Sequence, residues 1–208
     1  MAGALSFVAA ENGLENVMAN VHRQADVVVF SRIERRVGGI GELAARISRA
    51  CFEPPFERQA QIKAALVHAV IDRGLLSAEQ RQPAPEGYAR HVLYADPAGR
   101  FTILAIVWAA GQFSPPHAHH TWCGYAVHEG ELEETVFRWD PTEMRAEPLR
   151  TEVRKAGYGC YAGAGLDQIH KLGNSGASPA ISIHVYGVER ENIATHVNRL
   201  VDTGSATT

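Results

Sequence analysis

The sequence predicts a mainly β protein, an antiparallel sandwich or barrel with a fillable interior and a helical cap at its N-terminal end. The first observation is a series of short runs after residue 87 that are rich in aromatic and β-branched side chains. Gly, Pro, Asp and Asn separate these runs at a spacing of roughly ten residues, which is typical of antiparallel sandwiches and barrels. The second observation is a three-to-four spacing of apolar residues before residue 80, which favours helices. The runs are YARHVLYAD, RFTILAIVWAAG, TWCGYAVHEG, LEETVFRWD, TEVRKAG and PAISIHVYG.

Two helices are expected in the N-terminal part of the chain. The stretch FSRIERRVGGIGELAARISRA has a helical mixture of apolar and charged residues, although Gly38, Gly39 and Gly41 interrupt it. The stretch PFERQAQIKAALVHAVIDRGLL is the stronger helix, because Pro55 stands near its start and Gly74 stands where a C-terminal stop is expected.

A polar segment with prolines, SAEQRQPAPEG at residues 77–87, is expected to link the helices to the strands. We therefore predict an N-terminal helical region over residues 1–80 that packs on a barrel over residues 85–200, within a single structural domain. DPAGR at residues 96–100 and HEGE at residues 128–131 predict hairpin turns, because each contains a glycine and DPAGR also contains aspartate and proline, which are typical turn residues.

Composition narrows the classes of partner and compartment. The 208-residue chain is 46% hydrophobic and 21% charged, with a net charge of −3, so neither a nucleic-acid partner nor a membrane surface is expected. No apolar run reaches the roughly 18–20 residues that span a bilayer, and the first residues lack the basic start of a secretory signal. The three cysteines are Cys51, Cys123 and Cys160, and their wide spacing predicts reduced thiols in a cytoplasmic protein.

The stretch PPHAHHTWC, residues 115–123, carries three closely spaced histidines. If it is extended, His117 and His119 share one face and His120 points to the other. Two neutral imidazoles on one face can bind one metal ion at about 2.0–2.1 Å; the alternative is a solvated turn. His170, in GLDQIHKLGN, is a candidate third ligand. Its rivals are His91, His128 and His184.

A second polar pattern lies in the run PAISIHVYG. On a strand, Ser182, His184 and Tyr186 project to one face, while the intervening apolar residues project to the other. A polar stripe is costly to bury unless each group is hydrogen-bonded. The stripe therefore predicts either a solvated strand face or a relay that orients the Tyr186 hydroxyl over a reaction centre.

These motifs resemble the cysteine dioxygenase type I family and its bacterial thiol dioxygenase relatives, in the cupin superfamily. GQFSPPHAHHTWCGYAVHEG is similar to the first cupin motif, but no acid stands at Cys123 or Gly124, where most cupins have a glutamate ligand. CGYAVHEGELEETVFRW, the Ser-x-His-x-Tyr run and YARHVLY also match the thiol dioxygenases. The family pattern in the LEETVFRW segment falls on Leu132, Glu134, Thr135, Phe137 and Trp139.

The resemblance covers roughly residues 85–190 and implies a cupin-type jelly roll that holds Fe(2+) with His117, His119 and His170. It implies a Ser182–His184–Tyr186 relay. The implied activity, part of cysteine catabolism, is oxidation of L-cysteine by O2 to cysteine sulfinic acid. More remote alternatives are a three-histidine hydrolase or isomerase and a ligand-binding cupin. The oligomeric state and the role of the N-terminal helices stay open.

The resemblance also implies which residues bind the substrate. Arg90, with Tyr88 beside it, would bind the carboxylate of cysteine. The alternative substrate is 3-mercaptopropionate, whose carboxylate Arg199 or Arg190 would bind. Members of the family differ in a thioether between a cysteine and the relay tyrosine; here Cys123 and Tyr186 are the candidates for it.

Overall fold

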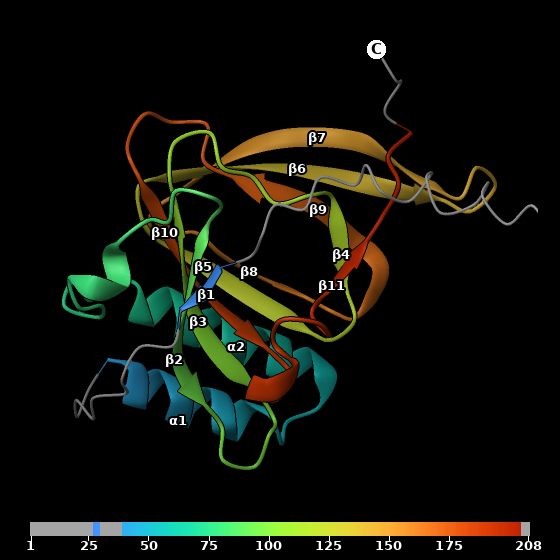
Figure 1. Cartoon of the computed structure of the whole chain (residues 1–208). Helices are drawn as coiled ribbons and strands as arrows, with labels where there is room; N and C mark the ends of the chain where they lie inside the picture. Colours follow the sequence, from blue (N-terminus) through green and yellow to red (C-terminus); the bar gives the residue numbers. More distant parts are fainter. Residues whose placement is uncertain (1–26, 30–38, 205–208) are drawn as a thin grey trace, which may run out of the picture.

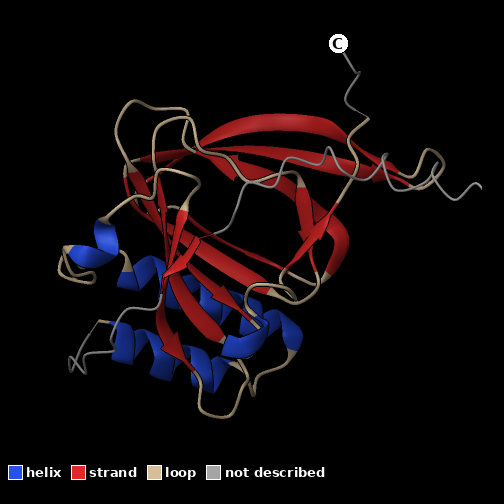
Figure 2. Cartoon of the chain, in the orientation of Figure 1, coloured by secondary structure: helices blue, strands red, loops and turns tan. Residues whose placement is uncertain are grey.

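The computed structural model describes residues 27–29 and 39–204 of the chain, as two facing β-sheets with helices over the outer face of one of them (Figures 1 and 2). The six-stranded sheet has the order β1 (Val27–Val29), β2 (Ala89–Ala95), β3 (Thr102–Trp108), β10 (Ala180–Tyr186), β5 (Cys123–Glu129) and β8 (Gly159–Ala162). The five-stranded sheet has the order β11 (Asn198–Leu200), β4 (His117–His119), β9 (Gly165–Gly173), β6 (Glu131–Asp140) and β7 (Arg145–Lys155). The predicted mainly β architecture with N-terminal helices is confirmed.

The two helices, α1 (Ile40–Ala50) and α2 (Pro55–Ala69), cover the six-stranded sheet (Figure 1). Their apolar faces join one face of β2, β3, β5 and β10 in the largest buried cluster. In β10, Ile181, Ile183 and Val185 belong to this cluster, so Ser182, His184 and Tyr186 face the space between the sheets. The alternation predicted for this strand is confirmed.

Glycine lets α2 approach the sheet closely. A Cβ atom at Gly159 would lie 2.6 Å from Cγ2 of Val67, and one at Gly124 would lie 2.9 Å from Cδ1 of Leu66. Both distances are too short for ordinary contact between carbon atoms. The absence of a side chain at these two positions therefore sets how near the helical layer lies to β5 and β8.

The helical region differs from the prediction in three places. Val27–Val29 form a strand parallel to β2, because three successive valines favour extended backbone at a sheet edge. α1 begins at Ile40, after Gly39 with a φ of 65°, and the earlier part of this predicted helix, residues 30–38, lies outside the described residues, as do residues 1–26. α2 ends at Ala69, before Gly74.

The linker over residues 77–87 contains one short 3₁₀ turn, η1 (Glu79–Arg81), and a second such turn, η2 (Arg190–Asn192), follows β10. The division of the chain at residues 80–85 stays a prediction. Within the described residues, no helix is long and apolar enough to cross a membrane.

Of the two predicted hairpins, one is confirmed and one is wrong. DPAGR joins β2 to β3, which pair antiparallel, and Gly99 has a φ of 70° in the turn. HEGE instead forms a corner, since β5 lies in the six-stranded sheet and β6 in the other. Gly130 has the positive φ of 72° that a tight reversal needs. A local pattern of this kind cannot distinguish a hairpin from a corner, because which strands pair is decided by distant segments.

The stretch from His117 to Cys123 is also divided. β4 ends at His119, and Cys123 begins β5 in the other sheet. Cys123 therefore lies on a different strand from the two histidines. All three residues still line one cavity, because that cavity lies between the two sheets.

Candidate metal centre

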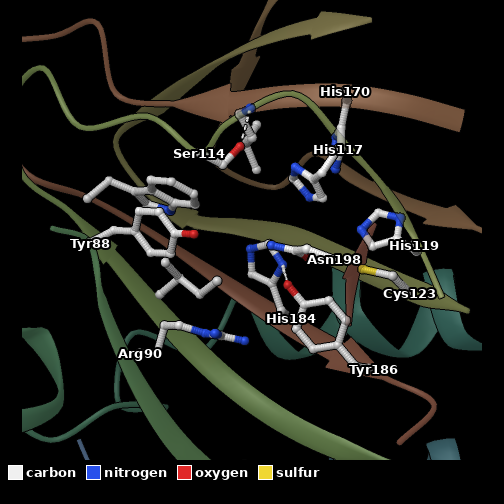
Figure 3. A pocket seen from close by; sticks show the side chains of 13 residues that line it. Tyr88, Arg90, Ser114, His117, His119, Cys123, His170, His184, Tyr186 and Asn198 are labelled. Carbon is white, nitrogen blue, oxygen red and sulfur yellow. Dashed lines mark hydrogen bonds between the residues drawn. The ribbon is translucent and has the colours of Figure 1, made fainter. Parts of the chain in front are cut away.

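Three histidines from two neighbouring strands come together between the sheets. His117 and His119 lie on β4, and His170 lies on β9 directly opposite His117 in the antiparallel register. One nitrogen atom of each ring lies within 4.8 Å of the corresponding atoms of the other two. His120 follows the end of β4 and is exposed. The three histidines form a metal site, and Figure 3 shows their rings around one side of a cavity.

The Nδ1 atoms of two of these rings are engaged away from the centre. Nδ1 of His117 lies 2.8 Å from the carbonyl oxygen of Pro115, to which it donates a hydrogen bond. Nδ1 of His170 lies 2.8 Å from Oε1 of Glu134. Each contact leaves Nε2 as the metal-binding atom, since a metal-ligating imidazole usually donates its other N–H to a protein acceptor.

Glu134 also pairs with a cation. Its Oε2 accepts a hydrogen bond from Nε of Arg154 at 2.7 Å, and the guanidinium of Arg154 lies over the ring of Tyr158 at 4.3 Å. Burial alone would raise the pKa of Glu134, but the hydrogen bonds from His170 and Arg154 lower that pKa to about 2. The carboxylate is therefore charged at neutral pH. Leu132 and Glu134 occupy alternate positions of β6, and both are buried. A glutamate on the buried face of a strand is unusual unless it is paired, and this was the feature of the sequence that could have indicated a role for Glu134 beside His170.

The electrostatics of the site keep two ligand rings neutral. Burial, followed by the proximity of His170, lowers the pKa of His117 to about 3. Burial and the proximity of His117 lower the pKa of His119 to about 2. Neutral imidazole is the form that binds metal ions, so these side chains need not lose a proton to do so near neutral pH.

The polar stripe on β10 forms a continuous hydrogen-bonded chain. Nε1 of Trp108 donates to Oγ of Ser182 at 2.9 Å, Oγ of Ser182 lies 2.8 Å from Nε2 of His184, and Nδ1 of His184 lies 3.1 Å from the hydroxyl of Tyr186. All are buried. Burial lowers the pKa of His184 well below its ordinary value. Trp108, on β3, was not predicted from the sequence, and its indole N–H adds a fourth member to this series of hydrogen bonds.

Arg90 and Tyr88 line the same cavity from the beginning of β2 (Figure 3). Arg90 is 3% exposed, and its Nη2 donates to the carbonyl oxygen of Ile193 at 3.0 Å. The ring of Tyr88 packs against Trp108 with a centroid distance of 4.5 Å. A buried guanidinium thus faces the space beside the three histidines.

Cys123 and Tyr186 are directly opposed in the antiparallel pair of β5 and β10. Both line the cavity, and a hydrogen bond from the side chain of Tyr186 lowers the pKa of Cys123. Burial nevertheless raises the pKa of the Cys123 thiol well above its ordinary value, so it is protonated at neutral pH.

The other candidates lie elsewhere. Arg190 and Arg199 are exposed, and neither is among the residues that line the cavity. Arg199 is paired with Ala118, the residue of β4 that points away from the two histidine ligands. His91 and His128 are buried outside the cluster, where their rings lie near the carbonyl oxygens of Gln82 and Val70.

The cavity is small, with a volume of about 20 Å³. A single water molecule needs roughly 10–15 Å³ of such volume, so only a compact ligand fits without movement of the walls. His119, Cys123 and His170 also line a wider cavity of about 650 Å³, and Glu134 lines it too. The relay and Arg90 belong to the small cavity, which is therefore the candidate reaction chamber.

The donor set fits a divalent transition metal. Imidazole nitrogen is a preferred donor for iron and for zinc. A metal held by three imidazoles would keep further coordination positions for a ligand, and Arg90 and Tyr186 line the same cavity as the three histidines. No carboxylate is among the three clustered donors.

This chain is similar in part to several known proteins. A double-stranded β-helix protein from Klebsiella pneumoniae is 19% identical, over 64% of this chain and 100% of that one, with a TM-score of 0.45. An RmlC-like cupin from Methanocaldococcus jannaschii is 12% identical, over 58% of this chain and 93% of that one, with a TM-score of 0.40. The family model for cysteine dioxygenase type I matches residues 55–198, which include the three histidines and the relay. The chain belongs to the cysteine dioxygenase type I family.

Proposed function

We propose that this protein is an Fe(2+)-dependent thiol dioxygenase that oxidises L-cysteine with O2 to cysteine sulfinic acid. The observation that carries the proposal is the placement of a buried arginine and a buried tyrosine relay in one small cavity with three histidines. In the overall reaction both oxygen atoms of O2 become bonded to the sulfur of the thiol. Sulfur loses four electrons and O2 gains them, so no further reductant is needed.

The three histidines would hold the iron. Bound there, the metal would supply a site at which a thiolate and O2 become neighbours, with a lowered pKa for the thiol. His117, His119 and His170 contribute no negative charge, which favours binding of an anionic sulfur.

Arg90 would bind and orient the substrate carboxylate. Its guanidinium can donate two parallel hydrogen bonds to a carboxylate, and burial strengthens such a contact because water does not compete for it. The bond from Arg90 to the carbonyl oxygen of Ile193 holds the side chain in place from the opposite side. The ring of Tyr88, packed on Trp108, would complete the wall beside the carboxylate.

The relay has a defined direction. The indole of Trp108 can only donate, so the hydroxyl oxygen of Ser182 accepts a hydrogen bond from it. The Ser182 O–H then donates to Nε2 of His184, the one acceptor recorded for that hydroxyl among the described residues. Neutral His184 then carries its proton on Nδ1 and donates to the oxygen of Tyr186. The Tyr186 O–H is thereby left to donate to another acceptor, which is the sulfur of Cys123 in this structure and would be a substrate oxygen when the cavity is filled.

The partners in this proposal are a small thiol and O2, in the cytoplasm and without nucleic acid or membrane; the walls of the cavity, about 20 Å³ in this structure, would have to move to admit the thiol. Arg90 favours L-cysteine over the arrangement in which Arg190 or Arg199 binds 3-mercaptopropionate, because those two arginines lie outside the cavity.

Oxygen uptake tests the proposal. The protein would be purified without air, its metal content measured, and the iron-loaded form supplied with L-cysteine, 3-mercaptopropionate and cysteamine. We expect one O2 consumed for each L-cysteine, with cysteine sulfinic acid as the product and the highest kcat/KM. Preference for 3-mercaptopropionate would contradict the substrate assignment. Stoichiometric zinc with no oxygen uptake from any thiol would contradict the dioxygenase assignment and favour a hydrolase, an isomerase or a ligand-binding cupin.

A further inference from the structure

The three histidine ligands differ in how their Nδ1 atoms are satisfied. His117 has the carbonyl oxygen of Pro115, and His170 has the carboxylate of Glu134, each at 2.8 Å. Nδ1 of His119 is completely buried and has no hydrogen-bond partner among the described residues. A buried N–H without an acceptor is costly, and metal-ligating imidazoles nearly always have an acceptor at that position. Of the three ligand rings, that of His119 therefore lacks the acceptor that a metal-binding imidazole needs at Nδ1.

Asn198 carries the complementary atom. Its Oδ1 is also completely buried and has no partner in the described part of the chain. Asn198 lies on β11 directly opposite His119 in the antiparallel register, so the two side chains share one face of the sheet. Both line the small cavity, and Figure 3 shows Asn198 among the side chains around it.

The strand register of the two residues suits a direct bond. Side chains directly opposite each other in an antiparallel pair have Cβ atoms about 4.5–5.5 Å apart. Rotation about the side-chain bonds of an asparagine and a histidine at that separation brings Oδ1 within hydrogen-bonding distance of Nδ1. The chemistry is also matched, because the amide oxygen only accepts and Nδ1 becomes a donor once Nε2 binds a metal.

We propose that Asn198 is the positioning residue of His119: its Oδ1 accepts the Nδ1–H of His119 in the metal-bound protein and holds Nε2 towards the metal. The three ligands are then supported by three different acceptors, a backbone carbonyl, a carboxylate and a side-chain amide. The proposal needs a metal at the three histidines, and it does not depend on which substrate the protein uses.

Metal affinity without substrate tests this role. Co²⁺ is the probe, with a competing chelator, because it binds imidazole without air oxidation complicating the measurement. We expect Asn198→Leu to weaken Co²⁺ binding by about 10- to 100-fold, the usual effect of losing a hydrogen-bond partner of a ligand. Asn198→Asp should restore the affinity, since a carboxylate oxygen accepts the same hydrogen bond. Asn192→Leu, at a half-buried asparagine whose side chain bonds to Glu189, is the matched control and should bind Co²⁺ like the parent protein.

A spectroscopic measurement separates positioning from a general loss of structure. In the Co²⁺ protein, each ligand Nδ1–H gives an exchangeable proton resonance shifted by the metal. Asn198→Leu should move or broaden the resonance of His119 and leave those of His117 and His170 unchanged. Unchanged affinity and an unchanged His119 resonance in a folded Asn198→Leu variant would overturn the proposal. If that variant does not fold, failure of Asn198→Asp to keep the His119 resonance would do the same. An effect of Asn198→Leu confined to the KM for the thiol would instead assign Asn198 to substrate contact.

Discussion

Glu134 accepts a 2.8 Å hydrogen bond from His170 while Arg154 holds its second carboxylate oxygen at 2.7 Å. A carboxylate in this position fixes which nitrogen of His170 faces the metal and makes the imidazole a stronger donor to it. Glu134 sits on β6, next to β9 in the same sheet. The strand that follows the corner at Gly130 thus supports a ligand that comes 36 residues later in the chain.

Glu134→Gln should therefore weaken metal binding. The amide retains an acceptor for His170 but loses the negative charge and faces Arg154 with a donor. We expect metal affinity to fall by about 10- to 100-fold, measured by competition with a chelator. Glu133→Gln, the adjacent residue on the other face of β6, is the control. Equal affinities in the two variants would show that the carboxylate does not act on the metal centre.

Removal of the ligand His170 should weaken metal binding more than the change at Glu134, which only supports that ligand. His170→Ala leaves two imidazoles, so we expect purified protein without stoichiometric iron and without oxygen consumption from L-cysteine. Metal analysis by mass spectrometry is the measurement. His120→Ala removes a histidine of the same cluster in sequence whose side chain is exposed, and it should retain iron. Full iron content and activity in His170→Ala would disprove the ligand assignment.

Arg90→Gln tests recognition of the carboxylate. Loss of a charge-assisted, bidentate contact should lower kcat/KM for L-cysteine by about 10²-fold. The same change should affect cysteamine much less, because cysteamine has no carboxylate. Arg199→Gln is the companion variant. A loss of 3-mercaptopropionate turnover in Arg199→Gln, with Arg90→Gln fully active, would favour the alternative arrangement.

Cys123 and Tyr186 face each other across two paired strands, which is the placement a thioether needs. After aerobic turnover with iron and L-cysteine, we expect a fraction of the protein to lose two hydrogen atoms in its intact mass, with O2 as the oxidant. Cys123→Ser should abolish this loss and Cys160→Ser should retain it. A parent protein that keeps its full mass after many turnovers would show that the two side chains remain separate.

Asp96 ties the β2–β3 turn to the helical layer and should make stability depend on pH. Hydrogen bonds from Arg100, first among them the side-chain bonds of 2.6 and 2.9 Å, lower the pKa of Asp96, and Arg100 also bonds to Ser48 of α1. A carboxyl with a lowered pKa in the folded state stabilises the fold above its unfolded pKa, about 3.9, and this contribution disappears as the pH falls further. Asp96→Asn should reduce the free energy of unfolding by about 1–3 kcal/mol at pH 7 and by less near pH 3.

Denaturant unfolding at several pH values is the measurement for Asp96. Asp167→Asn, an exposed position, is the matched control. A difference between Asp96→Asn and the parent that stays constant down to pH 3 would contradict the assignment of the effect to the charged carboxylate.

Local patterns in the sequence were sufficient to predict which face a side chain occupies, because that depends on one strand alone. The shared face of His117 and His119 follows from the alternation of a single strand, as does the separation of Ser182, His184 and Tyr186 from the intervening apolar residues. The family resemblance then indicated His170 as the third ligand, although periodicity by itself left His91, His128 and His184 open.

Only the tertiary structure decided which strands lie beside one another. HEGE has the composition of a hairpin, yet it sends β6 into the opposite sheet, where Glu134 reaches His170. The short strand β11, which the sequence pattern did not indicate, pairs with β4 and brings Asn198 opposite His119. Alternation determines which face a side chain occupies, because it is set by the backbone of that strand. The partner across the sheet is set by burial and pairing over the whole chain, and no local run of residues contains that information.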